Sequence, residues 1–374
     1  MSRVGMQRPD QRDRSRAGLS AIFEYFGRHD VPPIGSPLYE TLSAHVAGDD
    51  ALLELAAATE PAQPPPNQLF AAAQYLLLGG ARHPLRDHYP ALRDADAPAP
   101  PLADVPARFS DFCRLHAPAL RELIATRRTQ TNVVRRASFL LPGFAHVAAQ
   151  DPGRPLAQIE IGCSAGLNLN WHRFHYVFED GAGVSRHSWG DPEASVRVAT
   201  ELRGEMPPLP ARIPVASAAG VDLSPIDATD PDQQRWLRAL IWPEHVERHA
   251  RLRAAAELAA QHPPRLFAGD AGDALPRLLD ALPEDTTACV FATFTLYQFD
   301  DASARALFAA LKACGERRPV HFLGCELTGD HGDAELWWTR WSPDGKARAR
   351  LATCNPHGHW LSWRLPSGVE GPSA

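Results

Sequence analysis

The chain has no long apolar run, almost no lysine and no basic patch. Across its 374 residues, no stretch approaches the roughly 20 consecutive apolar residues of a membrane-spanning helix, so we expect no membrane association. Lys312 and Lys346 are the only lysines and the arginines are dispersed, which argues against a nucleic-acid partner. A hydrophobic content of 44% and a net charge of −6 are typical of a soluble globular protein.

The six cysteines are scattered and form no Cys-x-x-Cys pair. In a chain of this length, that pattern favours reduced thiols over a disulfide framework and predicts a cytoplasmic protein. The N-terminal segment carries no apolar stretch, so we expect no signal peptide. Cys354, His357 and His359 lie close together, but no second pair has matching spacing, and we predict no metal site.

Residues 1–150 have the pattern of an all-helical domain. Apolar side chains recur at helical spacing, and we expect helices at 19–28, 41–58, 67–78, 108–126 and 131–149. Proline-rich segments at 61–66 and 94–106 separate some of them, because proline does not fit a helix interior. The first 18 residues are polar, and we expect them to be disordered.

Residues 151–374 change character, because short apolar runs now alternate with amphipathic segments, as in parallel βαβ units. We expect strands at 156–161, 213–223, 264–269, 287–294 and 319–325. We expect helices at 231–260 (with a break at Trp242-Pro243), 272–281 and 301–314. The predicted fold class is therefore α/β, with a Rossmann-like domain that follows the helical one.

Two stretches depart from this rhythm. Residues 171–212 alternate polar and apolar side chains around Asp180-Gly181, which predicts an antiparallel β insertion. Near the end, apolar and β-branched residues flank Asp344-Gly345, which is a β-hairpin signal. We expect this hairpin and a last strand to occupy 333–365.

The most informative segment lies at 160–168. An apolar run carries an acid at Glu160, breaks into Gly162-Cys163-Ser164-Ala165-Gly166 and becomes apolar again at Leu167. This order predicts a strand, a tight turn and a helix start, where glycines let a ligand approach main-chain N–H groups. The same residues also match Gly-x-Ser-x-Gly, the nucleophile turn of serine hydrolases.

The first interpretation is a cofactor site. The turn is close to the Gly-x-Gly-x-Gly loop of class I S-adenosylmethionine-dependent methyltransferases, with Ser164 at the middle glycine, and Glu160 stands where such enzymes carry an acid. A second acid is expected to bind the ribose hydroxyls after the next parallel strand, and Asp222 is our choice. Glu179 and Asp180 have the more usual spacing, but their strand lacks a fully buried pattern. Asp270 ends the following strand, where it would meet the adenine amino group.

The second interpretation makes Ser164 a hydrolase nucleophile, which needs an acid and a histidine later in the chain. The candidates are Asp270 or Asp273 with His321, His331, His357 or His359. Against it, the hydrolase turn follows several strands, whereas the preceding chain here has a helical pattern. A purely structural turn is the third interpretation.

Six segments have a distinctive sequence. They are Arg-Thr-Gln-Thr-Asn at 128–132, Glu-Ile-Gly-Cys-Ser-Ala-Gly-Leu-Asn-Leu at 160–169, Trp-Gly-Asp-Pro at 189–192, Asp-Leu-Ser-Pro-Ile-Asp at 222–227, Trp-Leu-Arg-Ala-Leu-Ile-Trp-Pro-Glu at 236–244 and Arg-Pro-Val-His at 318–321. In these segments the chain resembles a bacterial family, domain of unknown function 2332, from about residue 19 to the last expected strand. The resemblance implies a class I methyltransferase-like second half and names no substrate. In that family an acid usually follows the Gln-Thr-Asn segment, whereas this chain has Val133.

Three residues are candidates for contact with a methyl acceptor. Tyr297 follows the fourth expected parallel strand, in a segment unlike the Asp/Asn-Pro-Pro-Tyr motif used on DNA bases, and it lines a pocket or is buried in the core. Glu244 follows a helix break at Trp242-Pro243 and faces the ligand crevice or caps a helix. Glu326 follows the last parallel strand and is a general base or a solvated acid.

We therefore predict S-adenosylmethionine-dependent methyl transfer to a small molecule. The residues expected to hold the cofactor are Glu160, Gly162, Ser164, Gly166, Asn168, Asp222 and Asp270. A serine hydrolase, a binding protein without catalysis and a fold without any cofactor are the alternatives. The sequence does not predict the oligomeric state.

Overall fold

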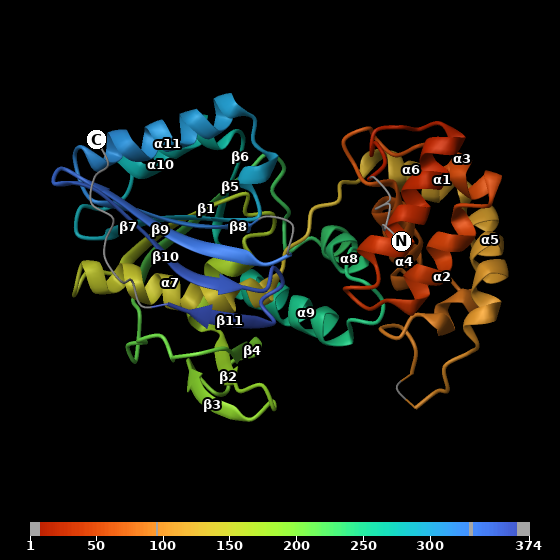
Figure 1. Ribbon diagram of the computed structural model, residues 1–374, viewed down its shortest axis with the longest axis horizontal. Coiled ribbons are helices and arrows are strands. Elements are labelled where there is room, and N and C mark those ends of the chain that lie inside the picture. Colours follow the sequence, from red (N-terminus) through yellow and green to blue (C-terminus); the bar gives the residue numbers. More distant parts are fainter. Residues whose placement is uncertain (1–7, 95, 329–331, 365–374) are drawn as a thin grey trace, which may run out of the picture. The chain divides into compact units, whose positions relative to one another are not determined.

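The computed structural model describes residues 8–94, 96–328 and 332–364. The chain forms two compact units (Figure 1). The first consists of Met1–Thr131 and Asp230–Arg253, and the second consists of Asn132–Thr229 and Ala254–Ala374. This division differs from the boundary expected at residue 150. Helix α7 (Ala137–Gln150) packs on the sheet of the second unit through Phe144, whereas α8 (Pro231–Ala239) packs on α4 of the first unit.

The first unit is built from short helices. They are α1 (Arg16–Tyr25), the π-helical turn η1 (Phe26–Asp30), α2 (Pro37–Val46), α3 (Asp50–Ala56), α4 (Pro65–Leu78), η2 (Pro84–His88), η3 (Leu102–Asp104), α5 (Val105–Leu115), α6 (Ala117–Thr126), α8 and the start of α9 (Val246–Gln261). The helix expected at 41–58 is two helices, because the Asp49 carboxylate caps α3. The helix expected at 108–126 breaks where Pro118 enters the first turn of α6. Residues 1–7 lie outside the described residues, and α1 begins within the segment expected to be disordered.

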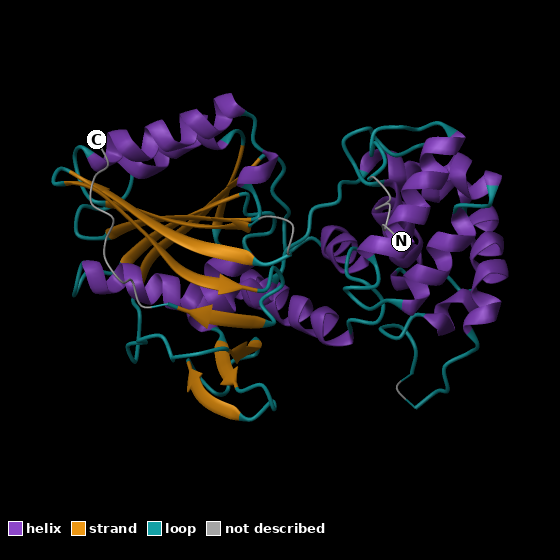
Figure 2. Ribbon diagram, viewed as in Figure 1, coloured by secondary structure: helices purple, strands orange, loops and turns teal. Residues whose placement is uncertain are grey.

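The second unit contains an eleven-stranded sheet (Figure 2), in the order β3-β2-β4-β11-β10-β9-β8-β7-β1-β5-β6. Its central strands are β1 (Leu156–Ile161), β5 (Val215–Asp222), β6 (Arg265–Ala268), β7 (Thr287–Thr293) and β8 (Val320–Leu327). These five strands are parallel, and their chain order across the sheet is 3-2-1-4-5, as in doubly wound folds. The order reverses between β1 and β7, and the carboxyl end of such a switch point is where these sheets bind ligands.

Helices cover both faces of the central strands (Figure 1). Ile159 and Ile161 of β1 pack on the face covered by α10 (Ala271–Asp280) and α11 (Asp301–Gly315). On the other face, the Phe144 ring of α7 stacks on Trp171 of η5 (Leu167–Arg173). Because side chains alternate along a strand, Glu160 belongs to the α7 and η5 face. No helix of the described ranges is long and apolar enough to cross a membrane.

The outer strands extend the sheet. Strands β2 (His175–Glu179) and β3 (Ser185–Trp189) form the expected antiparallel pair, but β4 (Arg197–Leu202) pairs in parallel with both β2 and β11 (Trp360–Trp363). The predicted insertion is therefore not purely antiparallel, and it continues the main sheet. The hairpin of β9 (Ala334–Ser342) and β10 (Gly345–Cys354) is confirmed, with Gly345 at a φ of 123° in its turn.

Candidate active site

The carboxyl ends of β1, β5, β7 and β8 bring together part of the predicted site. The N–H of Ser164, after β1, donates to the Asp222 carboxylate at the end of β5 over 2.8 Å. The N–H of Thr295, after β7, donates to the Glu326 carboxylate at the end of β8 over 2.9 Å. Gly162 faces the Thr295 side chain directly. Two turns therefore abut at the switch point, each held by an acid from a neighbouring strand.

The turn after β1 depends on left-handed backbone. Gly162, Ser164 and Gly166 have φ values of 69°, 51° and 63°. A Cβ on Gly162 would lie 2.3 Å from Thr295 Cγ2, and one on Gly166 would lie 2.8 Å from a Leu266 methyl carbon. Both glycines are thus required by backbone conformation and by space, as the sequence predicted for a tight turn. Ser164 accepts the strained conformation because the Asp222 carboxylate holds its N–H.

Asp222 ends the strand next to β1, where we expected the second acid. One of its oxygens accepts from Ser164 and the other accepts the N–H of Ser224 over 2.9 Å. The alternative acids are wrong for this role, because six strands separate β2, which ends at Glu179, from β1. Asp180 instead fixes the β2–β3 turn through the N–H groups of Ala182 and Val184.

Glu160 is buried beside an arginine that the sequence analysis missed. Its side chain is 3% exposed, and its Oε2 has no hydrogen-bond partner. Burial raises the pKa of the carboxyl well above its usual value, while the Arg136 guanidinium opposes that rise. Arg136 precedes α7, donates to Pro356 O over 3.1 Å and lies 4.2 Å from the Phe294 ring centroid. The sequence feature that could have identified Arg136 is its position directly before the apolar segment that forms α7.

The turn after β7 is strained and is braced by Glu326. Phe294 has a φ of 53°, which is rare for a bulky residue. Glu326 Oε1 accepts the N–H groups of Thr295 at 2.9 Å and Leu296 at 2.8 Å. Its Oε2 is buried without a hydrogen-bond partner, and burial raises the pKa of this carboxyl. Tyr297, in the same turn, is 72% exposed, so the prediction that it is buried in the core is wrong.

Five buried polar atoms around the two turns have no hydrogen-bond partner. They are Asn132 Oδ1, Glu160 Oε2, Ser164 Oγ, Asn168 Oδ1 and Glu326 Oε2. The amide of Asn132 donates to Cys163 O at 3.2 Å, and that of Asn168 donates to Val133 O at 3.5 Å, so both are tied to the turn and its surroundings. Buried polar atoms are normally satisfied, so these five are candidate contacts for a polar ligand or water.

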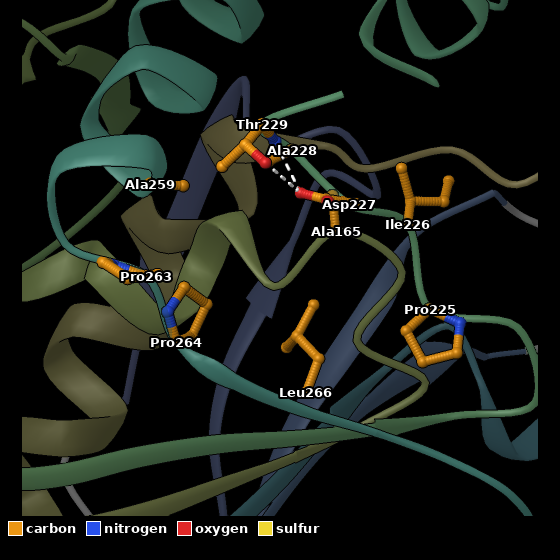
Figure 3. A pocket seen from close by; sticks show the side chains of 10 residues that line it. All are labelled: Ala165, Pro225, Ile226, Asp227, Ala228, Thr229, Ala259, Pro263, Pro264 and Leu266. Carbon is orange, nitrogen blue, oxygen red and sulfur yellow. Dashed lines mark hydrogen bonds between the residues drawn. The ribbon is translucent and has the colours of Figure 1, made fainter. Parts of the chain in front are cut away.

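A cavity of about 260 Å³ lies beside the turn (Figure 3). Its wall includes Ala165 and the prolines Pro225, Pro263 and Pro264. Its one ionisable lining side chain, Asp227, accepts the N–H and the hydroxyl of Thr229. This wall offers little to a charged ligand, and we assign the cavity no role.

Two predicted site residues have structural partners. The Asp270 carboxylate caps α10 by accepting the N–H of Gly272 at 2.7 Å, although the backbone bond from Gly269 to Asp222 O keeps this strand end beside the site. Glu244 belongs to the first unit, where it accepts the Ser36 hydroxyl at 2.6 Å and the N–H of Leu38 at 3.0 Å. The helix-capping interpretation is therefore the one that fits Glu244.

The described residues form neither a serine triad nor a metal-binding cluster. Ser164 Oγ has no hydrogen-bond partner, so no described histidine lies within bonding distance of it. His321 lies near the opposite, amino end of β8, 3.3 Å from Asp151, and His331 lies outside the described residues. Cys354 Sγ contacts Cys325 Sγ at 3.7 Å, and no three metal-ligating side chains gather among the described residues.

Comparisons with known proteins give a family and one solved structure. No curated protein matches the chain. A structure described as SAM-bound CalS10, an amino pentose methyltransferase of Micromonospora echinaspora involved in calicheamicin biosynthesis, overlaps 60% of this chain and 71% of its own, with 12% identity and a TM-score of 0.22. That overlap is too loose to bear on function. A family model matches residues 21–363, and the chain belongs to DUF2332, described as an uncharacterized protein conserved in bacteria.

Proposed function

We propose that the protein is an S-adenosylmethionine-dependent methyltransferase that acts on a small molecule. The observation that carries this proposal is the set of five unpartnered buried polar atoms around a left-handed, small-residue turn. The turn lies at the carboxyl end of the switch point of a doubly wound sheet, where such folds bind nucleotide-like ligands.

The donor and acceptor set fits this cofactor. S-adenosylmethionine carries an ammonium, a sulfonium and one carboxylate, so its net charge is positive. The Glu160 and Glu326 carboxyls interact with the Arg136 guanidinium, and the Asp222 carboxylate interacts with Glu160 and holds the turn. Three acids beside one arginine suit a cation. The free amide oxygens of Asn132 and Asn168 are further acceptors for an ammonium.

The chain's residues then have distinct tasks. Glu160 would hold the cofactor's ammonium, and Asp222 would accept the ribose hydroxyls, since each carboxylate oxygen accepts more than one hydrogen bond. Asp270 remains our candidate for the adenine amino group. The bound cofactor supplies an electrophilic methyl group, and the protein aligns an acceptor with it and excludes water.

Titration calorimetry with S-adenosylmethionine and S-adenosylhomocysteine tests the proposal. We expect micromolar binding that Glu160→Gln weakens at least about tenfold, a loss of about 1.4 kcal/mol. Glu179→Gln changes an acid on β2, which six strands separate from β1, and this matched control should bind like the wild type. Asp222→Ala is a poor probe, because it also removes the brace of the turn. Absence of binding at millimolar ligand would overturn the proposal, and binding without turnover of any acceptor would indicate a non-catalytic binding protein.

A further inference from the structure

The acceptor side of the candidate site has features that point to its substrate class, and this inference rests on the proposed function. The two carboxylate oxygens of Glu326 have different surroundings. Its Oε1 accepts two backbone N–H groups of the turn after β7, and its Oε2 is buried without a partner. A carboxylate oxygen held in place and left unpaired is prepared to accept from a ligand's N–H or O–H.

The same turn keeps its shape at the cost of backbone strain. Phe294 is left-handed, its N–H donates to Cys325 O at 2.8 Å, and the Arg136 guanidinium stacks on its ring. Strain of this kind persists where surrounding contacts over-determine a conformation, and it is concentrated at functional sites. The turn carries Tyr297 close to Glu326. Burial lowers the pKa of the Arg136 guanidinium, and the nearby Tyr297 phenol is among the groups that oppose this lowering.

Large apolar side chains surround this edge of the sheet. Leu223 follows β5 and is 72% exposed, Tyr297 follows β7 and is equally exposed, and Leu327 ends β8 and is 55% exposed. Because β5, β7 and β8 are parallel, their ends lie at one edge. An exposed apolar group beside buried polar atoms is typical of a site for an amphipathic ligand.

We propose that the methyl acceptor is an amine with an apolar body. Glu326 Oε2 binds the nitrogen and takes its proton, and the exposed apolar side chains at the strand ends contact the rest of the molecule. The excess of carboxylates at this edge disfavours an anionic acceptor. An alcohol lacks the positive charge that a carboxylate binds most strongly.

These roles give a methyl-transfer reaction that conserves atoms and charge. An ammonium has no free electron pair, so it first gives one proton to the Glu326 carboxylate. The nitrogen then bonds to the methyl carbon of the sulfonium donor, and the carbon–sulfur bond breaks with its electron pair on sulfur. The product is a methylated ammonium, and Glu326 returns its proton to water.

Three probes with one apolar body test the acceptor class: 2-phenylethylamine, 2-phenylethanol and phenylacetate. Their binding to the full chain is measured by saturation-transfer NMR and calorimetry, with and without S-adenosylhomocysteine. We expect the amine to bind at least about tenfold more tightly than the alcohol or the acid. Glu326→Gln should remove that preference while it keeps the turn, because the amide oxygen still accepts the two N–H groups. Tyr297→Ala should weaken all three probes several-fold, and Val184→Ala, a change at an exposed apolar residue on the β2–β3 turn, should weaken none.

Tighter binding of phenylacetate, equal binding of the alcohol, or an amine preference that survives in Glu326→Gln would each overturn the inference. The wild-type comparison alone decides it if a variant fails to fold. If the amine binds with the expected preference while neither S-adenosyl compound binds, the proposed function fails and the amine site stands. If S-adenosylhomocysteine binds and the amine preference is absent, the acceptor class is wrong and the proposed function stands.

Discussion

At the scale of single residues, the turn after β1 depends on the space beside Gly162. Gly162→Ala adds a methyl group 2.3 Å from Thr295 Cγ2 at a left-handed φ. We expect about 1–2 kcal/mol of backbone strain and a further 1–3 kcal/mol from overpacking. Gly153→Ala is the matched control, since its φ is 84° and nothing lies within 4 Å. Urea denaturation measures the free energy of unfolding of both variants. Equal losses in the two variants would contradict the predicted clash between a residue-162 methyl group and Thr295.

Another residue-scale prediction concerns the proton on Glu160. Burial raises the pKa of this carboxyl, and a bound cation favours its ionised form, so binding should release a proton. The affinity for S-adenosylmethionine should therefore fall as the pH is lowered. Calorimetry in buffers of different ionisation enthalpy counts the protons released, and Glu160→Gln should reduce that number. An unchanged count in the variant would assign the proton to another group.

The arginine at 136 shows the limit of residue-level prediction. Glu160, Gly162 and Gly166 were predicted from the sequence because a turn between a strand and a helix constrains residue types locally, and Asp222 was predicted because it ends the next parallel strand. Arg136 lies 24 positions before Glu160, and its place over Phe294 depends on how α7 packs, which no local pattern contains.

At the scale of elements, the five parallel strands were predicted to within about two residues at each end. Strands β1 and β7 and most of β8 are buried and therefore appear in the sequence as continuous apolar runs, whereas β5 and β6 are only partly buried. Pairing of distant segments was not predictable. The parallel pairs of β4 with β2 and β11, and the assignment of α7 to the second unit, depend on contacts far apart in sequence. Helix ends set by a single cap, such as Asp49, were also missed.

Glu244 gives an element-scale prediction. Its carboxylate binds the Ser36 hydroxyl and the N–H of Leu38 at the start of α2. Glu244→Ala should lower the stability of the first unit by about 1–3 kcal/mol, because buried donors lose their acceptor. Binding of S-adenosylhomocysteine should stay unchanged. Glu122→Ala, at an exposed position of α6, is the control for thermal unfolding. A Glu244→Ala variant that is as stable as the wild type but loses ligand binding would indicate that Glu244 belongs to the binding site.

At the scale of the whole molecule, we expect three buried or half-buried histidines to limit stability in acid. Burial lowers the pKa of His146, His172 and His249 from 6.5 to about 4. The unfolded chain therefore binds these protons first, so stability is fully present above about pH 6.5 and is lost as the pH falls toward 4. The expected slope is up to about 1.4 kcal/mol per pH unit for each histidine. Thermal unfolding between these pH values checks this, and His146→Leu should flatten the dependence. A dependence that His146→Leu leaves unchanged would show that other groups cause it.

We expect a nucleoside cofactor to bind at the β1 and β7 ends of the second unit. Amide hydrogen exchange with and without saturating S-adenosylhomocysteine tests it most directly, because protection is located along the chain. We expect slower exchange in peptides that cover residues 160–168 and 293–298, with no change in β2 and β3. Unchanged exchange at 160–168, or protection confined to other segments, would contradict it.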